Sequence, residues 1–134
     1  QPIAKDYCGT CTKCIDACPT QAILPNKTIE ANHCISYYTI ELKKQTIETG
    51  ADRGYQDWAF GCDICQDVCP WNRFSHPHQE AKFKPIEGLL TMSKDAWLEM
   101  EETSFKARFK QSPLLRSKLN GIKRNIEYLK DQGQ

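Results

Sequence analysis

The residues from position 8 to position 19 read Cys8-Gly-Thr-Cys11-Thr-Lys-Cys14-Ile-Asp-Ala-Cys18-Pro19. Three cysteines at two-residue spacing, then a fourth after three intervening residues and before a proline, are the pattern of bacterial ferredoxins with two iron–sulfur clusters. A second run, Cys62-Asp-Ile-Cys65-Gln-Asp-Val-Cys69-Pro70, has the last three cysteines of this pattern and Ala59 where the first would stand. The chain contains 8 cysteines, so the remaining one, Cys34, completes two sets of four.

The spacing predicts that the two runs exchange their last ligands. Three cysteines in a tight turn can surround one corner of a cubane, whereas the fourth starts to point away and the following proline stops the chain from curling back. We therefore expect one [4Fe–4S] cluster to be bound by Cys8, Cys11, Cys14 and Cys69. The other is expected to be bound by Cys18, Cys34, Cys62 and Cys65.

Two other uses of the cysteines are possible. Four disulfides would suit a secreted scaffold, but such scaffolds rarely place Cys-Pro after two matching triplets, and the sequence shows no signal peptide. Structural zinc is a stronger rival, because Cys-x-x-Cys pairs are its usual ligands. Zinc sites, however, normally use two separated pairs and not a run of four that ends in Cys-Pro. The pattern therefore favours two cubanes.

Composition and charge narrow the class of protein. The 134 residues suffice for one compact domain or two closely packed parts. No apolar run approaches membrane-spanning length, and the thiolate ligands suit a reducing compartment, so we expect a soluble, cytoplasmic protein without membrane contacts. The formal net charge is only +1, yet residues 106–130 hold eight basic side chains and one acidic one. This asymmetry indicates either an anionic partner or a solvated helical face.

The sequence predicts an α+β fold: a ferredoxin-like domain over residues 1–75, with a helical insertion, and a basic region of short helices over residues 76–134. Two short strands are expected around Ile23 and Ile29, joined by a turn at Pro25-Asn26-Lys27. The insertion should contain a helix over residues 35–44 and a shorter one over residues 55–60.

Helix boundaries in the second half are predicted from caps. Ser93 is expected to cap a helix that continues to Met100, with Trp97 facing inward, and Ser104 a helix that continues to Lys110. Ser112-Pro113 should start a helix that ends near Asn120-Gly121, and a last helix should cover residues 122–130.

With these motifs in view, the chain resembles epoxyqueuosine reductases. The resemblance is carried by Tyr7-Cys-Gly-Thr-Cys-Thr-Lys-Cys-Ile-Asp-Ala-Cys-Pro-Thr-Gln-Ala-Ile23, by Cys34-Ile-Ser-Tyr-Tyr-Thr-Ile-Glu-Leu42 and by Phe60-Gly-Cys-Asp-Ile-Cys-Gln-Asp-Val-Cys-Pro-Trp-Asn72. A fainter match runs from Phe105 through Ser112-Pro113 to Lys123-Arg124-Asn125. The segment around Cys34 and the stretch from Cys69 to Asn72 are more specific than the Cys-Pro motif, which many ferredoxins share. Gln21 departs from the glycine that is common in the family.

The resemblance implies a tRNA-modifying enzyme. Its members reduce the epoxide of epoxyqueuosine in tRNA to give queuosine, using a cobalamin that receives electrons through two [4Fe–4S] clusters. The cobalamin-binding domain and the acidic catalytic residue precede the cluster domain in that family, so this chain would be the electron-transfer part of a longer enzyme and would contain no catalytic residue itself. The resemblance further implies that the Cys8 set faces the cobalamin and that the Cys18 set accepts electrons from an external low-potential donor.

Candidate contacts with the substrate and the cobalamin follow from this picture. Ser36 and Tyr37 are expected on the cobalamin side, with ordinary packing against the cluster as the alternative. Trp71 would stack on a base or on the corrin ring, or shield a cluster from water. The predicted contacts to tRNA phosphates are Lys106, Arg108, Lys110, Arg116, Lys118, Lys123 and Arg124.

Three other functions compete with this interpretation. A free-standing ferredoxin-like electron carrier would need only the first seventy residues and leaves the basic segment unexplained. The cluster domain of another corrinoid-dependent reductase, such as a reductive dehalogenase, would share the cofactors but not the segment that follows Cys34. A nucleic-acid-binding module would use its clusters only to hold the fold together.

Overall fold

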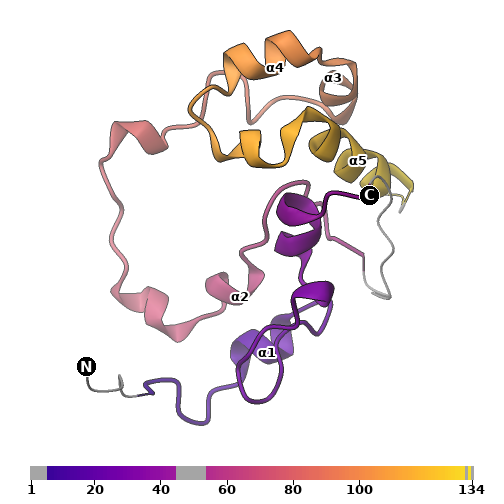
Figure 1. Cartoon of the computed structure of the whole chain (residues 1–134). Helices are drawn as coiled ribbons and strands as arrows, with labels where there is room; N and C mark the ends of the chain where they lie inside the picture. Colours follow the sequence, from indigo (N-terminus) through magenta and orange to yellow (C-terminus); the bar gives the residue numbers. More distant parts are fainter. Residues whose placement is uncertain (1–5, 45–53, 132, 134) are drawn as a thin grey trace, which may run out of the picture.

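The computed structural model describes residues 6–44, 54–131 and 133, and Figure 1 shows their course. Their regular structure consists of short helices: α1 (Lys13–Ala17), η1 (Ala31–His33), η2 (Tyr37–Glu41), α2 (Ile64–Asp67), η3 (Pro70–Phe74), η4 (Ala81–Phe83), α3 (Lys94–Glu99), α4 (Glu102–Arg108), η5 (Pro113–Arg116) and α5 (Lys118–Asp131). Of the elements labelled η, η2 is a π-helix and the others are 3-10 helices. A search of these residues finds no helix that is long and apolar enough to cross a membrane.

The two cysteine runs form a pair of similar short helices, α1 and α2, which pack against one another. In each run the last cysteine lies beyond the helix in an extended conformation, with ψ of 114° at Cys18 and 123° at Cys69. The prolines at positions 19 and 70 explain this, because a proline disfavours helical backbone at the residue before it. Each last cysteine is thereby separated from the helical turn that carries its predecessors.

The strand component of the predicted α+β fold is not confirmed. Ile23 and Ile29 form one isolated antiparallel bridge, and the described segments contain no sheet. The predicted turn is present, with Lys27 at φ of +64° and its backbone N–H donating to Leu24 O over 2.7 Å. Ile29 is 61% exposed, so this hairpin has no second layer against which a longer ladder would be stabilised.

The insertion between Cys34 and Cys62 is less helical than predicted. The helix expected over residues 35–44 ends earlier: η2 is followed by Leu42, whose backbone is extended with ψ of 126°. Residues 54–60, where a second helix was expected from Tyr55, form turns and bends. Positions 45–53, between these two predicted helices, lie outside the described residues.

The second half packs around an apolar core formed by α4, α5 and their neighbours. Its buried members are Phe105, Phe109, Leu119, Ile122 and Ile126. Trp97 of α3 packs against this core, as predicted, and its ring stacks on Phe109 with centroids 5.3 Å apart and an interplanar angle of 14°.

The predicted helix starts in this half are partly correct. Ser93 caps α3, as expected, by accepting a hydrogen bond from the backbone N–H of Ala96 over 3.1 Å. Ser104 does not start a helix, because α4 already begins at Glu102. The predicted break near Gly121 is also wrong, since α5 continues through it without interruption.

The last helix, α5, connects the two halves. Its residue Leu129 belongs to a second buried cluster with Ile35 and Tyr55, and partly buried residues of this cluster include Cys62. The cysteine-bearing half therefore rests on α5, as Figure 1 shows near the centre of the molecule. We retain the division into residues 1–75 and 76–134 as a proposal, with α5 as the main contact between them.

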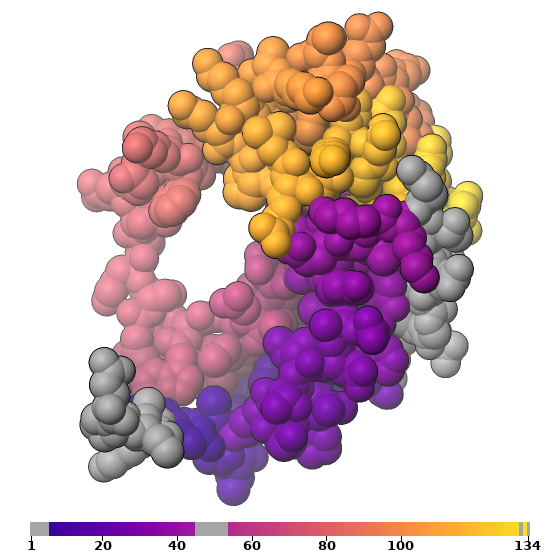
Figure 2. Space-filling view, in the orientation of Figure 1, coloured from indigo at the N-terminus to yellow at the C-terminus, as the bar shows by residue number. Residues whose placement is uncertain are grey.

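An extended segment joins the two halves on the other side of the molecule. After η3 the chain runs through residues 75–85, all of which are exposed, and it includes the short helix η4. Figure 2 shows this segment arching away from the rest of the chain, with open space between them. Apolar side chains remain uncovered here, among them Phe74 at 56% and Phe83 at 72% exposure.

Candidate iron–sulfur centres

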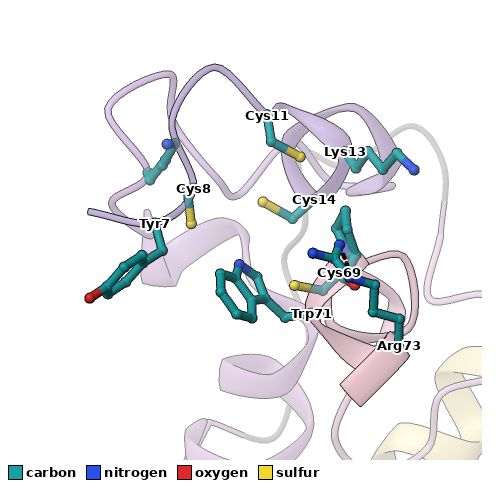
Figure 3. A pocket seen from close by; sticks show the side chains of 10 residues that line it. Tyr7, Cys8, Cys11, Lys13, Cys14, Cys69, Trp71 and Arg73 are labelled. Atoms are coloured by element: carbon teal, nitrogen blue, oxygen red, sulfur yellow. Dashed lines mark hydrogen bonds between the residues drawn. The ribbon is translucent and has the colours of Figure 1, made fainter. Parts of the chain in front are cut away.

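One cavity gathers four cysteines of the first predicted set. It has a volume of about 180 Å³, and Cys8, Cys11, Cys14 and Cys69 all line it. Figure 3 shows the four sulfur atoms turned into one space, with the indole of Trp71 along its side. Three of the cysteines come from the first run and the turn that leads into α1, whereas Cys69 comes from the far end of α2. Cys8 is exposed and the other three are half-buried.

A second cavity gathers the other four. Its volume is about 220 Å³, and its lining includes Cys18, Cys34, Cys62 and Cys65. Cys18 follows α1, Cys34 lies just before the helical segment of the insertion, and Cys62 and Cys65 belong to the second run. The remaining walls are mostly apolar, with Ile23, Ile29 and Ile35 among them.

The size of the cavities matches a cluster better than a single ion. A water molecule needs roughly 10–15 Å³ of such volume, so each cavity exceeds the space for one water molecule by a factor of about 12 or more. Within the described part of the chain, no group of three or more His, Cys, Asp or Glu side chains converges closely enough to hold one metal ion. Four thiols spread around a larger space form the donor set that a [4Fe–4S] cubane requires.

Hydrogen bonds from the backbone and from a hydroxyl group favour the thiolate form of Cys18. The backbone N–H of Ala22 donates to Cys18 Sγ over 3.2 Å, and Thr20 Oγ1 lies 3.7 Å from the same sulfur. Burial acts to raise the pKa of this thiol, but these hydrogen bonds outweigh it, and the pKa lies below its usual value.

Burial has the opposite net result at Cys62 and Cys65. It raises the pKa of both thiols, and the neighbouring Cys18 and Cys34 raise it further by repulsion between negative charges. All four thiols line the same cavity. Four thiolates together are unfavourable unless positive charge is placed between them, which an iron cluster supplies.

The two cavities differ in their surroundings. The first is lined by the cationic side chains of Lys13, Lys27 and Arg73 and by two aromatic rings, those of Tyr7 and Trp71. These rings meet edge to face with centroids 5.9 Å apart, and they are 70% and 48% exposed. Within the described parts of the chain, no Asp, Glu, Lys, Arg or His side chain lines the second cavity. The first therefore opens onto a cationic and aromatic surface, and the second faces apolar side chains.

The structure places Ser36, but not Tyr37, in the lining of the second cavity. Ser36 lines the cavity that contains Cys34, and both residues are half-buried. The ring of Tyr37 packs edge to face against Tyr38, with centroids 5.7 Å apart. These contacts fit the packing alternative of the sequence analysis, and the contact with cobalamin stays a proposal.

The predicted basic residues separate into groups. Arg108 and Lys110 line a cavity of about 610 Å³ together with Lys82 and Lys84, which the sequence analysis did not select. Lys118 lines another, of about 370 Å³. Its neighbours there include Lys43 and Lys44. Lys123 is half-buried and lines neither of these two cavities.

Exposed acidic side chains pair with two of the predicted cations. Arg116 forms a two-pronged contact with Glu41, in which Nε and Nη2 lie 2.5 and 2.9 Å from the two carboxylate oxygens. The pKa of Glu41 is lowered by this hydrogen-bonded contact. Lys106 lies 3.1 Å from Glu102, one helical turn away. These two cations are already partly neutralised within the protein.

Arg124 lines the same cavity as Lys118, but its guanidinium group is engaged within the protein, and its contact with tRNA stays a prediction. Its side chain is 7% exposed, and its guanidinium group donates to the backbone carbonyls of Tyr38, Leu42 and Lys44 over 2.8–2.9 Å and to Asn125 Oδ1. The carbonyl of Tyr38 belongs to η2, and those of Leu42 and Lys44 follow it. The last carbonyl groups of a helix have no partner within the helix, and Arg124 supplies one here. No signal in the sequence separates Arg124 from its exposed neighbours, because the carbonyls that surround it come from a distant segment.

Comparisons with known proteins agree with this geometry. Residues 7–72 match the family described as "4Fe-4S double cluster binding domain", a range that contains all eight cysteines. Among curated relatives, the epoxyqueuosine reductase of Cellulophaga algicola is 53% identical over 93% of this chain, and that of Synechocystis is 43% identical over 90%. The chain belongs to the epoxyqueuosine reductase family. It therefore contains a domain that binds two [4Fe–4S] clusters.

Solved structures of this family also resemble the chain. An epoxyqueuosine reductase from Bacillus subtilis has a TM-score of 0.73 and 31% identity, covering 92% of this chain and 32% of its own. Another, crystallised with an epoxyqueuosine-modified stem loop of tyrosine tRNA, has a TM-score of 0.71 and 30% identity, covering 92% and 32%. The chain spans about two fifths of the length of its curated relatives, since it covers 40% of the Cellulophaga protein and 42% of the Synechocystis protein.

Proposed function

We propose that this chain is the electron-transfer part of an epoxyqueuosine reductase, which relays electrons through two [4Fe–4S] clusters to a cobalamin and thereby reduces epoxyqueuosine to queuosine in tRNA. The observation that carries the proposal is the pair of four-cysteine cavities, in a chain that is up to 53% identical to proteins of that name. Bound clusters supply one-electron transfer, and the cobalamin supplies the reduction of the epoxide.

The proposed ligands are those predicted from the spacing. Cys8, Cys11, Cys14 and Cys69 would bind the first cluster, and Cys18, Cys34, Cys62 and Cys65 the second. In this arrangement each short helix serves both sites. α1 contains Cys14 of the first set and is followed by Cys18 of the second, and α2 contains Cys65 of the second set and is followed by Cys69 of the first. A movement of either helix would disturb both clusters, so the crossing fixes the separation between them.

The surroundings of the cavities support an order of electron flow. We assign the first cluster to the cobalamin side, because Tyr7 and Trp71 present exposed aromatic surface beside it. A flat apolar ring system and a second protein surface are both suited to such a patch. The second cluster would accept electrons from an external low-potential donor. Contacts of Ser36 and Tyr37 with the cobalamin are also proposed, although Ser36 lines the cavity of the second cluster.

Contacts to tRNA are proposed at the basic groove, defined here as the cavity lined by Lys82, Lys84, Arg108 and Lys110. Among the residues that the structure describes, no acidic side chain lines this cavity, and Pro85, Ile86, Leu89 and Pro113 supply apolar walls. Clustered cations attract phosphate groups, and the affinity of such binding falls steeply as the salt concentration rises. Support for tRNA as the partner comes from the related protein whose structure contains a modified tRNA stem loop. Lys118 and Lys123 remain secondary candidates.

Other functions are less well supported. A free-standing electron carrier would not explain the basic groove. Membership of the epoxyqueuosine reductase family favours neither such a carrier nor the cluster domain of a different corrinoid-dependent reductase. A cytoplasmic location stays part of the proposal, in keeping with a tRNA substrate.

The test is conversion of the modified nucleoside. A protein of the relatives' full length that contains this chain would be loaded with iron, sulfide and cobalamin, and incubated with epoxyqueuosine-containing tRNA and a low-potential reductant. Nucleoside analysis by mass spectrometry should show queuosine, and Cys69→Ala should abolish its formation while cobalamin binding persists. If the fully loaded protein cycles its clusters but leaves epoxyqueuosine unchanged, the proposed function is refuted.

A further inference from the structure

A buried hydroxyl group connects the two chain segments that bring Cys34 and Cys62 to the second cavity. Thr39 is fully buried, and its Oγ1 donates to the backbone carbonyl of Ile35 over 2.8 Å. The same oxygen accepts a hydrogen bond from the backbone N–H of Gly61 over 3.0 Å. Ile35 directly follows Cys34, and Gly61 directly precedes Cys62. One side chain therefore fixes the backbone beside both cysteines.

An asparagine from α5 holds the same two segments from the other side. Asn125 is fully buried, and its Nδ2 donates to the carbonyl of Thr39 over 2.9 Å and to that of Ala59 over 2.8 Å. Its Oδ1 accepts two hydrogen bonds from Arg124. Both hydrogens and both lone pairs of the amide are thus used. Ser117 Oγ also donates to Thr39 O, over 2.8 Å.

We propose that Thr39 and Asn125 are positioning residues for the second cluster, because they fix the backbone from which Cys34 and Cys62 reach it. Neither side chain lines the cavity, so they act through the backbone of the ligand-bearing segments. Cys34 most needs such support, since it lies outside both cysteine runs. The cysteines of the first set belong to the runs themselves, next to α1 and α2, and need no hydrogen bond from α5.

The network also gives α5 a role in the cluster domain. A ferredoxin-like domain that recruits its fourth ligand from an insertion must hold that insertion at a fixed distance from the second run. Residues that orient metal ligands without touching the metal typically change metal affinity about 10- to 100-fold when they are replaced. Loss of the network should therefore weaken the second cluster and leave the first unchanged.

The experiment compares Thr39→Val with Thr39→Ser in the iron-loaded protein. Valine has nearly the same shape but no hydroxyl group, whereas serine keeps the hydroxyl group. Iron release to a chelator would be followed anaerobically by absorbance, together with the EPR spectrum after reduction. For Thr39→Val we expect four of the irons to leave roughly 10- to 100-fold faster, with the other four leaving as in the unmodified protein. Thr39→Ser should restore most of the original rate.

Two controls keep the outcome specific. Ile126→Val removes a methyl group from the buried core on the same helix and leaves the hydrogen bonds of Thr39 and Asn125 in place, so its release rates should stay those of the unmodified protein. Should Thr39→Val fail to fold, Asn125→Ser provides the second variant, with the same expected preference for one cluster. Equal acceleration of all the irons, no acceleration, or the same pattern in Ile126→Val would each overturn the proposal.

This inference rests on the proposed assignment of Cys34 as a ligand, and Cys34→Ala separates the two. If that variant still holds both clusters, the ligand assignment fails and the inference fails with it. If Cys34→Ala retains one cluster, and this cluster releases its iron at the rate of the unmodified protein, the ligand assignment stands. The Thr39 variants alone then decide the positioning role.

Discussion

Replacing Arg124 with methionine should destabilise the protein far more than replacing Arg116, although both arginines bind the same segment. Arg124 is buried and donates to the carbonyls of Tyr38, Leu42 and Lys44 and to Asn125. Arg116 is exposed and binds the carboxylate of Glu41. The two side chains thus differ mainly in whether water can replace the lost hydrogen bonds.

The magnitude follows from which acceptors stay buried. Lys44 is exposed, and Tyr38 and Leu42 are half-buried, so water can partly reach their carbonyls, whereas Asn125 is fully buried. A buried acceptor without a partner costs about 1–3 kcal/mol, and more where the lost donor was charged. Part of this is offset by the packing of the methionine side chain. We expect a loss of about 3–5 kcal/mol for Arg124→Met, and a much smaller loss for Arg116→Met, because the ion pair of Arg116 is exposed to water.

The assay is thermal unfolding of the iron-loaded protein under anaerobic conditions, at a fixed heating rate and followed by far-ultraviolet circular dichroism. For a chain of this size, 1 kcal/mol corresponds to a shift of about 3–5 °C, so Arg124→Met should lower Tm by at least about 10 °C. Arg116→Met should lower it by no more than about 4 °C. Arg124→Lys keeps the charge but loses the planar fork, and should fall between these values.

Equal shifts for Arg124→Met and Arg116→Met would refute the reasoning. That result would mean that Arg124 is as accessible to water as Arg116, and its role as a phosphate contact would have to be reconsidered. A salt-dependent loss of tRNA binding in Arg124→Met, without a change in Tm, would contradict the account in the same way.

Three further predictions concern the core, the groove and the metal. Phe109→Ala should cost about 3–5 kcal/mol in unfolding experiments because the ring is fully buried, whereas Phe83→Ala, at 72% exposure, should change stability by less than about 0.5 kcal/mol. Replacing Lys82, Lys84 and Lys110 together by alanine should weaken tRNA binding and reduce the steepness of log K against log salt by about 0.7 for each lost phosphate contact. Lys106→Ala serves as the control, and an unchanged slope in the triple variant would exclude the groove as the tRNA-binding site. Removing iron should expose the amides of residues 8–40 to hydrogen exchange before those of α5, which has its own apolar core; simultaneous exposure would show that the two parts unfold together.

The features that the sequence predicted well depend on local chemistry. The Cys-Pro pairs predict an extended backbone at Cys18 and Cys69, and the structure has it. The two cavities gather the cysteines in the sets that the spacing predicts, while the bonds to iron stay a prediction. Ser93 before an apolar periodic segment was enough to locate the start of α3.

The features that it predicted poorly depend on contacts between distant segments. Gly121 suggested the end of a helix, but a Cβ atom there would lie 3.3 Å from Ser117 Cβ, so the glycine allows close packing between the continuous α5 and the residue that precedes it. Arg124 reads as one more exposed cation until the end of η2 is placed beside it. Lys82 and Lys84 lie outside the basic segment, and only the fold brings them to Arg108 and Lys110.

The central claim is that Cys34 completes the second of two four-cysteine sets. Iron and acid-labile sulfide, counted together with the EPR spectrum of the reduced protein, test it most directly when the unmodified protein is compared with Cys34→Ala. We predict about eight irons and eight sulfides with signals from two interacting clusters, reduced in the variant to about four of each with the signal of one isolated cluster. A variant that keeps both clusters, or an unmodified protein that binds zinc or a single cluster, would contradict the account.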